Sequence, residues 1–581
     1  MKLRNGRVVG GENEGEIGCS GSYVGSRMRD ERTPFGVSLL AVLLVPLHAW
    51  TQPGMRMSGS RSARSMPAAC SAVPPTGSAT APATAAMGLD SLPDPVGLSP
   101  WVALRGVSSC RNFADFMSHL RREQGDALML DLRPVLPPVY LLQGKAANRN
   151  VFSALDVSLE QILQELITLL PVAARVPSEV DYELQKRVAS LFSNAAVVNQ
   201  RLPSFIASAE CICDRWVGRP AAESSTESCT ESSIASSAGS AGSAGSDERG
   251  RSGSITGSGS GIDRELGGGS GSVGIASLDV FAELSEFVLC SDLEVLYGRA
   301  FCDAHGPQLL TSFRGWIRNI ASGGSPVTFF SELGTLLRET LAAMRADRSL
   351  YAGERSVLQV YAEQGALEKH DDDALVGLLS MTLMAAVFNT QVSLAWILVH
   401  LYSDRSLLER ARDELRGCPN LADYDELAKL EFVNSCIDEA VRMHTMLPGN
   451  TVLRKAKRSI TLGKTAVPEG AVLWLYPNAV HNDEAYFPEP KTFCPMRLLS
   501  GNLERMNDAF ELVTFGHGQK RCIGEKMARA MICAFLGVVL PRLEAEPPDE
   551  LPDDGLFDLI PASKLRLYQL RERQAPSNDA T

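Results

Sequence analysis

With 581 residues, 45% of them apolar, the chain is long enough to bury one large core and still carry tails. Its net charge of −12, with no basic stripe, argues against a nucleic-acid partner. The 13 cysteines are scattered and lack the cysteine or histidine neighbours at the spacing that a zinc site requires.

The first 98 residues do not resemble folded sequence, and we expect a disordered leader. Residues 35–50 form one apolar run, shorter than the roughly 20 residues that span a bilayer, which predicts a short anchor or a signal segment. Residues 52–88 are rich in Ser, Ala, Pro and Arg and contain no acid, as transit segments do. We expect the endoplasmic reticulum membrane, with a plastid or another organelle as the alternative.

Residues 99–574 are predicted to form one domain, followed by a tail at 575–581. Residues 220–273 within it are mostly Ser, Gly, Ala and Thr, a composition that predicts a disordered insertion. Apolar periodicity elsewhere predicts helices at 112–123, 157–170, 180–216, 278–297, 326–346, 372–402, 405–417 and 425–447, and strands within 127–142 and 452–475. Without a βαβ alternation, the fold class is mostly α with small β-sheets.

Near the carboxyl end, Cys522 lies in a loop punctuated by glycines, Phe515 to Gly524, and an apolar helix predicted at 527–540 follows it. A thiolate at a helix N-terminus is stabilised by unpaired backbone N–H groups and by the helix dipole. Gly518 and Gly524 let the backbone pass close to a flat partner, where a Cβ would clash. The pattern indicates an iron ligand; the alternative is a buried structural cysteine.

The stretch resembles the haem-binding loop of the cytochrome P-450 superfamily, Phe-x-x-Gly-x-(Arg/His)-x-Cys-x-Gly, with Lys520 in the cationic position. The resemblance implies the cytochrome P-450 fold. It also implies haem b (iron protoporphyrin IX) as cofactor, with Cys522 as the metal ligand and Phe515, Gly518, Lys520 and Gly524 as cofactor contacts. A thiolate ligand pushes electron density onto haem iron and favours O–O cleavage.

Two more motifs precede the cysteine in the order that the superfamily shows. Glu439 and Arg442 have the i, i+3 spacing that places two side chains on one helix face, and Arg497 follows in the segment 493–497. They resemble the superfamily's Glu-x-x-Arg helix and its meander, which implies that the three charges interlock behind the haem loop. We expect them to hold that loop in position; unrelated surface charges are the alternative.

The helix predicted at 372–402 is expected to cross the distal face of the haem. The superfamily's usual pattern there contains an acid and an alcohol that relay protons, whereas this chain has Phe388, Asn389 and Thr390. Asn389 and Thr390 are the predicted catalytic pair, similar to the cholesterol 7α-hydroxylase and prostacyclin synthase group. Neither side chain titrates near neutrality, and two polar residues in a helix groove are the alternative.

Two segments, 177–187 and 278–285, resemble sterol 14α-demethylases specifically. This resemblance implies that Lys186, Arg454 and Lys520 contact the haem propionates, which need cationic partners. Solvated turn residues are the alternative. That family has a Tyr-Asp pair before the helix that corresponds to the one predicted at 180–216. The pair is absent from this chain, which argues against sterol demethylation.

The resemblance as a whole implies a monooxygenase that inserts one oxygen atom of O₂ into a lipophilic, sterol-like or lipid substrate. Its electrons would come from an NADPH-cytochrome P-450 reductase or an equivalent donor, with Arg521 and Lys526 as contacts. Met384, Val387, Phe388 and residues 447–452 are expected to line the substrate cavity. A haem-thiolate isomerase or dehydratase that acts on oxygenated fatty acids, and a non-catalytic haem-binding protein, are the alternatives. His444, His481 and His517, and likewise Cys436 and Cys533, are expected to be core or surface residues without a catalytic role.

Overall fold

The computed structural model describes residues 92–97, 113–130, 137–154, 156–158, 182–218, 262–263, 275–320, 327–350, 353–444, 451–462, 464–552 and 565–573. Leu92 is fully buried, and strand β1 (Val96–Gly97) pairs in parallel with β2 (Ala127–Leu130). The predicted end of the leader at residue 98 is therefore too late. The apolar run 35–50 lies outside the described residues.

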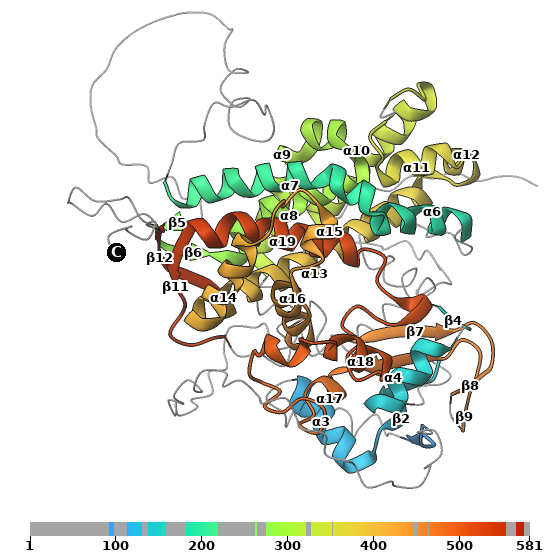
Figure 1. The fold of residues 1–581 in the computed structure, drawn as a ribbon. Helices are drawn as coiled ribbons and strands as arrows, with labels where there is room; N and C mark the ends of the chain where they lie inside the picture. Colours follow the sequence, from blue (N-terminus) through green and yellow to red (C-terminus); the bar gives the residue numbers. More distant parts are fainter. Residues whose placement is uncertain are drawn as a thin grey trace, which may run out of the picture.

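The larger part of the fold is helical, and its centre is α13 (Asp372–Ser403) (Figure 1). The Asp371 side chain accepts a hydrogen bond from the Ala374 N–H at 2.7 Å and begins the helix. The rest of the helix carries apolar residues on every side, as expected for a helix that is buried on most of its surface. The helices with the most extensive contacts to it are α8 (Val280–Tyr297), α10 (Val327–Ala346), α14 (Arg405–Arg416), α16 (Glu431–Met443) and α19 (Glu525–Arg542). The helical part is completed by α6 (Tyr182–Ser193), α7 (Ala195–Trp216), α9 (Arg299–Ile320), α11 (Val357–Glu363), α12 (Ala366–Lys369) and α15 (Tyr424–Leu427).

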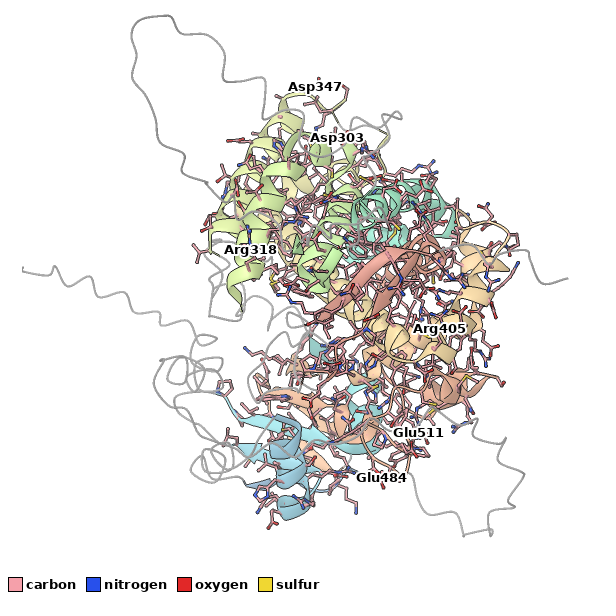
Figure 2. All side chains as sticks on the ribbon, turned by 90° about the vertical axis from the view of Figure 1, so that its left-hand side faces the viewer. Asp303, Arg318, Asp347, Arg405, Glu484 and Glu511 are labelled. Atoms are coloured by element: carbon pink, nitrogen blue, oxygen red, sulfur yellow. The ribbon has the colours of Figure 1, made fainter. Side chains whose placement is uncertain are left out.

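The smaller part is built on a six-stranded sheet with the order β1-β2-β3-β10-β7-β4. Strand β10 (Val472–Tyr476) pairs in parallel with β3 (Val139–Gln143) and antiparallel with β7 (Val452–Ala456). Strand β4 (Val157–Ser158) forms one edge. The remaining short elements of the chain's described residues are α3 (Phe113–Gln124), α4 (Gly144–Ser153), β8 (Ile460–Leu462), β9 (Thr465–Val467), α17 (Asn478–His481), η2 (Pro495–Leu498), α18 (Asn502–Asp508) and η3 (Gly518–Lys520). Figure 2 shows the two parts from the side: Asp303 and Arg318 mark the helical part, and Glu484 and Glu511 the sheet part.

A second sheet has the order β11-β12-β6-β5. It joins β11 (Leu543–Glu546) and β12 (Arg566–Glu572), near the carboxyl end, to β6 (Ile275–Asp279). Its edge strand β5 (Ile262–Asp263) falls inside the insertion predicted at 220–273. The insertion therefore contributes a strand near its end, and its other residues lie outside the described ranges.

Most predicted elements are present in the described ranges, so the mostly helical class with small sheets is confirmed. Several local predictions are wrong. Helices α4, α9, α11 and α12 were not predicted, and residues 157–158 are a strand and not the start of a helix. The helix expected at 180–216 is divided into α6 and α7, and the one expected at 425–447 is divided into α15 and α16. Among the described residues only α13 has the length and apolar composition of a membrane span, and most of it is buried against other helices.

Candidate functional site

The loop that carries Cys522 is held in a fixed shape by its own backbone. The Cys522 N–H donates a hydrogen bond to the Phe515 carbonyl oxygen at 2.7 Å, which closes the loop. Gly516 and Gly518 have φ values of 76° and 56°, which favour glycine. A Cβ on Gly516 would overlap the Lys520 carbonyl oxygen, so Gly516 is the sterically strictest glycine of the loop. It was absent from the predicted site, although the sequence shows it next to Phe515.

The Cys522 side chain stands directly before α19 and is exposed. The protein surrounding the sulfur still raises the pKa of the thiol, while hydrogen bonds from the Gly524 and Glu525 backbone N–H groups act in the opposite direction. These two groups belong to the unpaired donors of the helix N-terminus, as predicted. Cys436 and Cys533, in contrast, are fully buried core thiols.

Glu439, Arg442 and Arg497 come together as predicted. Arg442 forms two hydrogen bonds of 2.8 Å with the Glu439 carboxylate, and Arg497 Nε reaches Glu439 Oε1 at 3.0 Å. The Glu439 and Arg442 side chains are 0% exposed. The other donors of Arg442 bond to the carbonyl oxygens of His481 (2.7 Å) and Pro490 (2.8 Å), so the buried charges are fully engaged.

A second ion-pair network, which the sequence analysis missed, lies next to the first. Arg529 on α19 binds both carboxylate oxygens of Asp438 at 2.9 Å and also reaches Glu525 at 3.0 Å. Arg521 completes the network through two bonds to Glu525, at 2.6 and 2.9 Å. The i, i+4 spacing of Glu525 and Arg529 was a visible signal. The contact of Arg529 with Asp438 spans 91 positions and had no local signal.

Of the three predicted propionate partners, the structure brings two together. Lys520 Nζ donates to the carbonyl oxygens of Phe152 (3.1 Å) and Ala154, at the end of α4. Burial, and next the positive charge of Arg454 on β7, lower the pKa of Lys520 to about 8. Two cations that repel each other across a partly buried space suit an anionic ligand. Lys186 lies in the first turns of α6, and its side chain is outside the described part of the chain.

The centre of α13 has one open and one packed side. Ala385 and Asn389 are exposed, whereas Thr390 is buried, so the predicted catalytic pair does not share one face. The Asn389 side-chain amide donates to the Ala385 carbonyl oxygen at 2.9 Å. Val387 and Phe388, which were expected to line the substrate cavity, are core residues. Phe388 packs edge-on against Trp316 of α9, with ring centroids 5.0 Å apart.

Two of the histidines fill core positions, as expected. His444 stacks on Trp396 with ring centroids 3.7 Å apart, and its Nε2 lies 3.0 Å from His400 Nε2. The His481 ring accepts a hydrogen bond from the Val513 N–H at 3.2 Å. Burial lowers the pKa of His400 and of His481 to about 3. His517 packs against Phe510, with ring centroids 4.1 Å apart.

The residues present fit a haem with a thiolate ligand. The exposed Cys522 sulfur supplies the ligand, backbone N–H groups stabilise its charge, and Lys520 with Arg454 forms a cationic pair that suits the propionates. Asn389 lies on the exposed side of the long helix α13. No group of His, Cys, Asp and Glu in the described ranges could hold a different metal ion.

Comparisons with known proteins agree with this assignment. A family model for Cytochrome P450 matches residues 334–563. The chain is 29% identical to human Cytochrome P450 4F3 over 37% of this chain and 43% of that protein. It is 28% identical to the mitochondrial 25-hydroxyvitamin D-1 alpha hydroxylase of Rattus norvegicus over 35% of this chain and 40% of that protein. The matches thus span less than half the length of these curated relatives.

The fold matches over a longer stretch. The structure of retinoic acid bound cyanobacterial CYP120A1 is similar with a TM-score of 0.58, covering 83% of this chain and 100% of that one, at 16% identity. These relatives do not single out the sterol 14α-demethylase, cholesterol 7α-hydroxylase and prostacyclin synthase group, and that nearer placement stays a prediction. The family model thus identifies residues 334–563 as cytochrome P450 sequence, and the cysteine loop and the fold agree with the cytochrome P450 superfamily.

Proposed function

We propose that the protein is a haem-thiolate monooxygenase that inserts one oxygen atom of O₂ into a lipophilic substrate, with electrons from an NADPH-dependent reductase. The observation that carries the proposal is the exposed Cys522 thiol at the start of α19, in a loop closed by its own backbone. When bound, the haem supplies the oxygen-activating chemistry, and a thiolate ligand favours O–O cleavage.

In this proposal the chain's own residues bind and orient the cofactor. Cys522 would hold the iron, and the N–H groups of Gly524 and Glu525 would stabilise the negative charge of the ligated sulfur. Lys520 and Arg454 neutralise the propionates, together with Lys186. Phe515 and Gly518 shape the loop that would contact the porphyrin.

On the opposite side, Asn389 is the polar group that can hold dioxygen or a water molecule by a hydrogen bond. Its exposed amide and the small exposed Ala385 leave the centre of α13 open. A lipophilic substrate is supported by the names of two similar proteins, of which one hydroxylates a vitamin D compound and the other was solved with retinoic acid. Neither name identifies the substrate of this chain.

Arg521 and Lys526 remain the proposed contacts for the reductase. Arg521 is 49% exposed despite its pairing with Glu525, and Lys526 is exposed above the Tyr424 ring, 5.7 Å from its centroid. The endoplasmic reticulum membrane remains the proposed location. Residues 35–50, the candidate anchor, lie outside the described residues.

A haem-thiolate isomerase or dehydratase is the second candidate, and one observation favours it. Residues 374–403 of α13 contain no carboxylate, so the exposed centre of the helix offers no acid that could relay protons. Rearrangement of an oxygenated fatty acid needs neither a reductase nor such a relay.

Turnover assays separate the two candidates. Purified holoprotein would be mixed with reductase and NADPH, and sterols, fatty acids and fatty-acid peroxides would be screened first by their spin-state shift. We expect a binding compound to stimulate consumption of oxygen and NADPH and to gain one oxygen atom. Monooxygenation would be contradicted if a fatty-acid peroxide were converted without reductase and no other compound were converted in the presence of reductase and NADPH.

A further inference from the structure

We propose that Arg529, acting with Asp438, positions the Cys522 loop and thereby sets how well the sulfur serves as a thiolate ligand. This inference rests on the proposed haem-thiolate function. Arg529 is the point at which α16, α19 and both ends of the loop meet. Its side chain is only 12% exposed and Asp438 is 1% exposed, so the pair is shielded from solvent and from salt.

The first end of the loop is held through Asp438 and through the Phe515 ring. Thr514 Oγ1 donates to Asp438 Oδ1 at 3.2 Å, while the Arg529 guanidinium lies over the Phe515 ring, 4.7 Å from its centroid. The Phe515 carbonyl oxygen accepts the hydrogen bond from the Cys522 N–H. Displacement of Phe515 therefore moves the backbone of the ligand itself.

The second end is held through Glu525, whose backbone N–H is one of the two donors that face the sulfur. Its carboxylate is bound by Arg529 at 3.0 Å and by Arg521 at 2.6 Å. Arg529 contacts Asp438 through Nη2 and Glu525 through both Nη2 and Nε, the latter at 3.1 Å. A lysine ammonium has a single nitrogen and cannot present donors from two positions of one rigid plane. One side chain thus couples the N–H group near the sulfur to α16.

The network also connects the loop to the buried Glu439 cluster. Asp438 and Glu439 are consecutive residues of α16, and they bind arginines from different segments, Arg529 and Arg442. A carboxylate that lost Arg529 would be left almost fully buried without its strongest partner. We therefore expect Asp438 and Arg529 to act as one unit whose effects on the ligand are not additive.

The test compares Arg529→Met, Arg529→Lys, Asp438→Asn and the double variant Asp438→Asn/Arg529→Met with the wild-type holoprotein. The readouts are haem affinity and the fraction of reduced, CO-bound protein that shows the red-shifted thiolate band. We expect Arg529→Met to lower haem affinity roughly 10- to 100-fold, as loss of a partner behind a metal ligand does. At full haem loading, part of its CO band should move to the position of a protein without a thiolate ligand.

Arg529→Lys should fall between wild type and Arg529→Met, and the double variant should equal the worse single variant. Arg416→Met, which removes an exposed arginine paired with Asp413 on the surface, is the matched control and should leave both readouts unchanged. If Arg529→Met does not fold, Thr514→Val replaces it in the same test, because this variant removes only a single contact to Asp438.

A merely structural role predicts a different pattern. The melting temperature would fall in the Arg529 and Asp438 variants while the haem-loaded protein kept its complete thiolate band, and that result would overturn the proposal. If the wild type itself lacks the red-shifted band, the haem-thiolate function fails instead, so the two failures are distinguishable.

Discussion

The two sides of the candidate haem site are built in different ways. Behind Cys522, largely buried arginines and carboxylates from α16, α19 and η2 bind one another in two networks. On the side that we propose lies opposite, the exposed centre of α13 carries one amide, Asn389, bonded within its own helix. The structure therefore fixes the ligand firmly and leaves the opposite face with few polar constraints.

The difference indicates which residues support folding and haem binding and which residues affect turnover. A ligand position that depends on several charges tolerates few substitutions, because removal of one partner leaves a buried charge unpaired. The open face of α13 can change residue type at little cost in stability, since its side chains contact few others. We expect variants on the ligand side to affect folding and haem binding, and variants on the α13 side to affect turnover.

The largest effect is expected from Glu439→Ala, because it leaves Arg442 and Arg497 without their carboxylate. We expect a loss of about 3–5 kcal/mol in the free energy of unfolding, measured by urea titration. Glu426→Ala is the control, since its partner Lys429 is 67% exposed, and it should change stability by less than about 0.5 kcal/mol. Equal losses in the two variants would remove the argument that the buried cluster is special.

The second largest effect is expected from acid, which should lower the stability of the ligand side. His400, His444 and His481 are held neutral with pKa values below the usual value of about 6.5, so the unfolded chain binds more protons than the folded protein once the pH falls below that value. The stability that they contribute is present above pH ~6.5 and decreases as the pH falls towards 3. Each group lowers the free energy of unfolding by up to about 1.4 kcal/mol per pH unit.

His481→Gln tests this slope, because the amide oxygen can still accept the hydrogen bond from Val513. Urea titrations between pH 7 and pH 5 should show a shallower loss of stability in the variant. A slope equal to that of the wild type would mean that His481 is not a neutral buried group.

On the α13 side, Asn389→Ala should change turnover and leave haem content intact. Loss of one hydrogen bond is worth about 0.5–1.5 kcal/mol, so the coupling of NADPH consumption to product should drop by up to roughly tenfold. Thr390→Val should leave the coupling unchanged, because Thr390 is buried on the packed side. Loss of haem in Asn389→Ala would show a structural role, and equal effects at both positions would contradict the distinction between the two faces.

The smallest effect is expected far from either side, in the Gly- and Ser-rich insertion. Removal of residues 224–260 keeps β5 and should change the free energy of unfolding by less than about 1 kcal/mol, since loop length affects closure entropy only slowly. Haem content should equal that of the wild type. A collapse of expression or haem content would show that this segment is part of the folded domain.

The sequence was most informative where a function needs residues close together along the chain. The Cys522 loop and the Glu439–Arg442 pair are short patterns, and Arg497 was found through its own local motif. The contact between Asp438 and Arg529 joins distant segments, and neither residue belongs to a recognised pattern. It therefore emerged only from the structure.

Two other misses have different physical causes. Helix α9 contains Pro307 next to Gly306, and such residues normally interrupt a helical pattern. Helix α13 is apolar all round, so periodicity could not show that Phe388 faces the core while Asn389 faces outwards. The existence of this helix was predictable, but the direction of its side chains was not.

The carbon-monoxide difference spectrum of the reduced protein, compared with that of Cys522→Ala, tests the central claim most directly. We expect the red-shifted thiolate band in the wild type, its complete loss in Cys522→Ala, and its retention in Cys533→Ala, which removes a buried core thiol. A red-shifted band that survives in Cys522→Ala would place the iron ligand elsewhere and contradict the account.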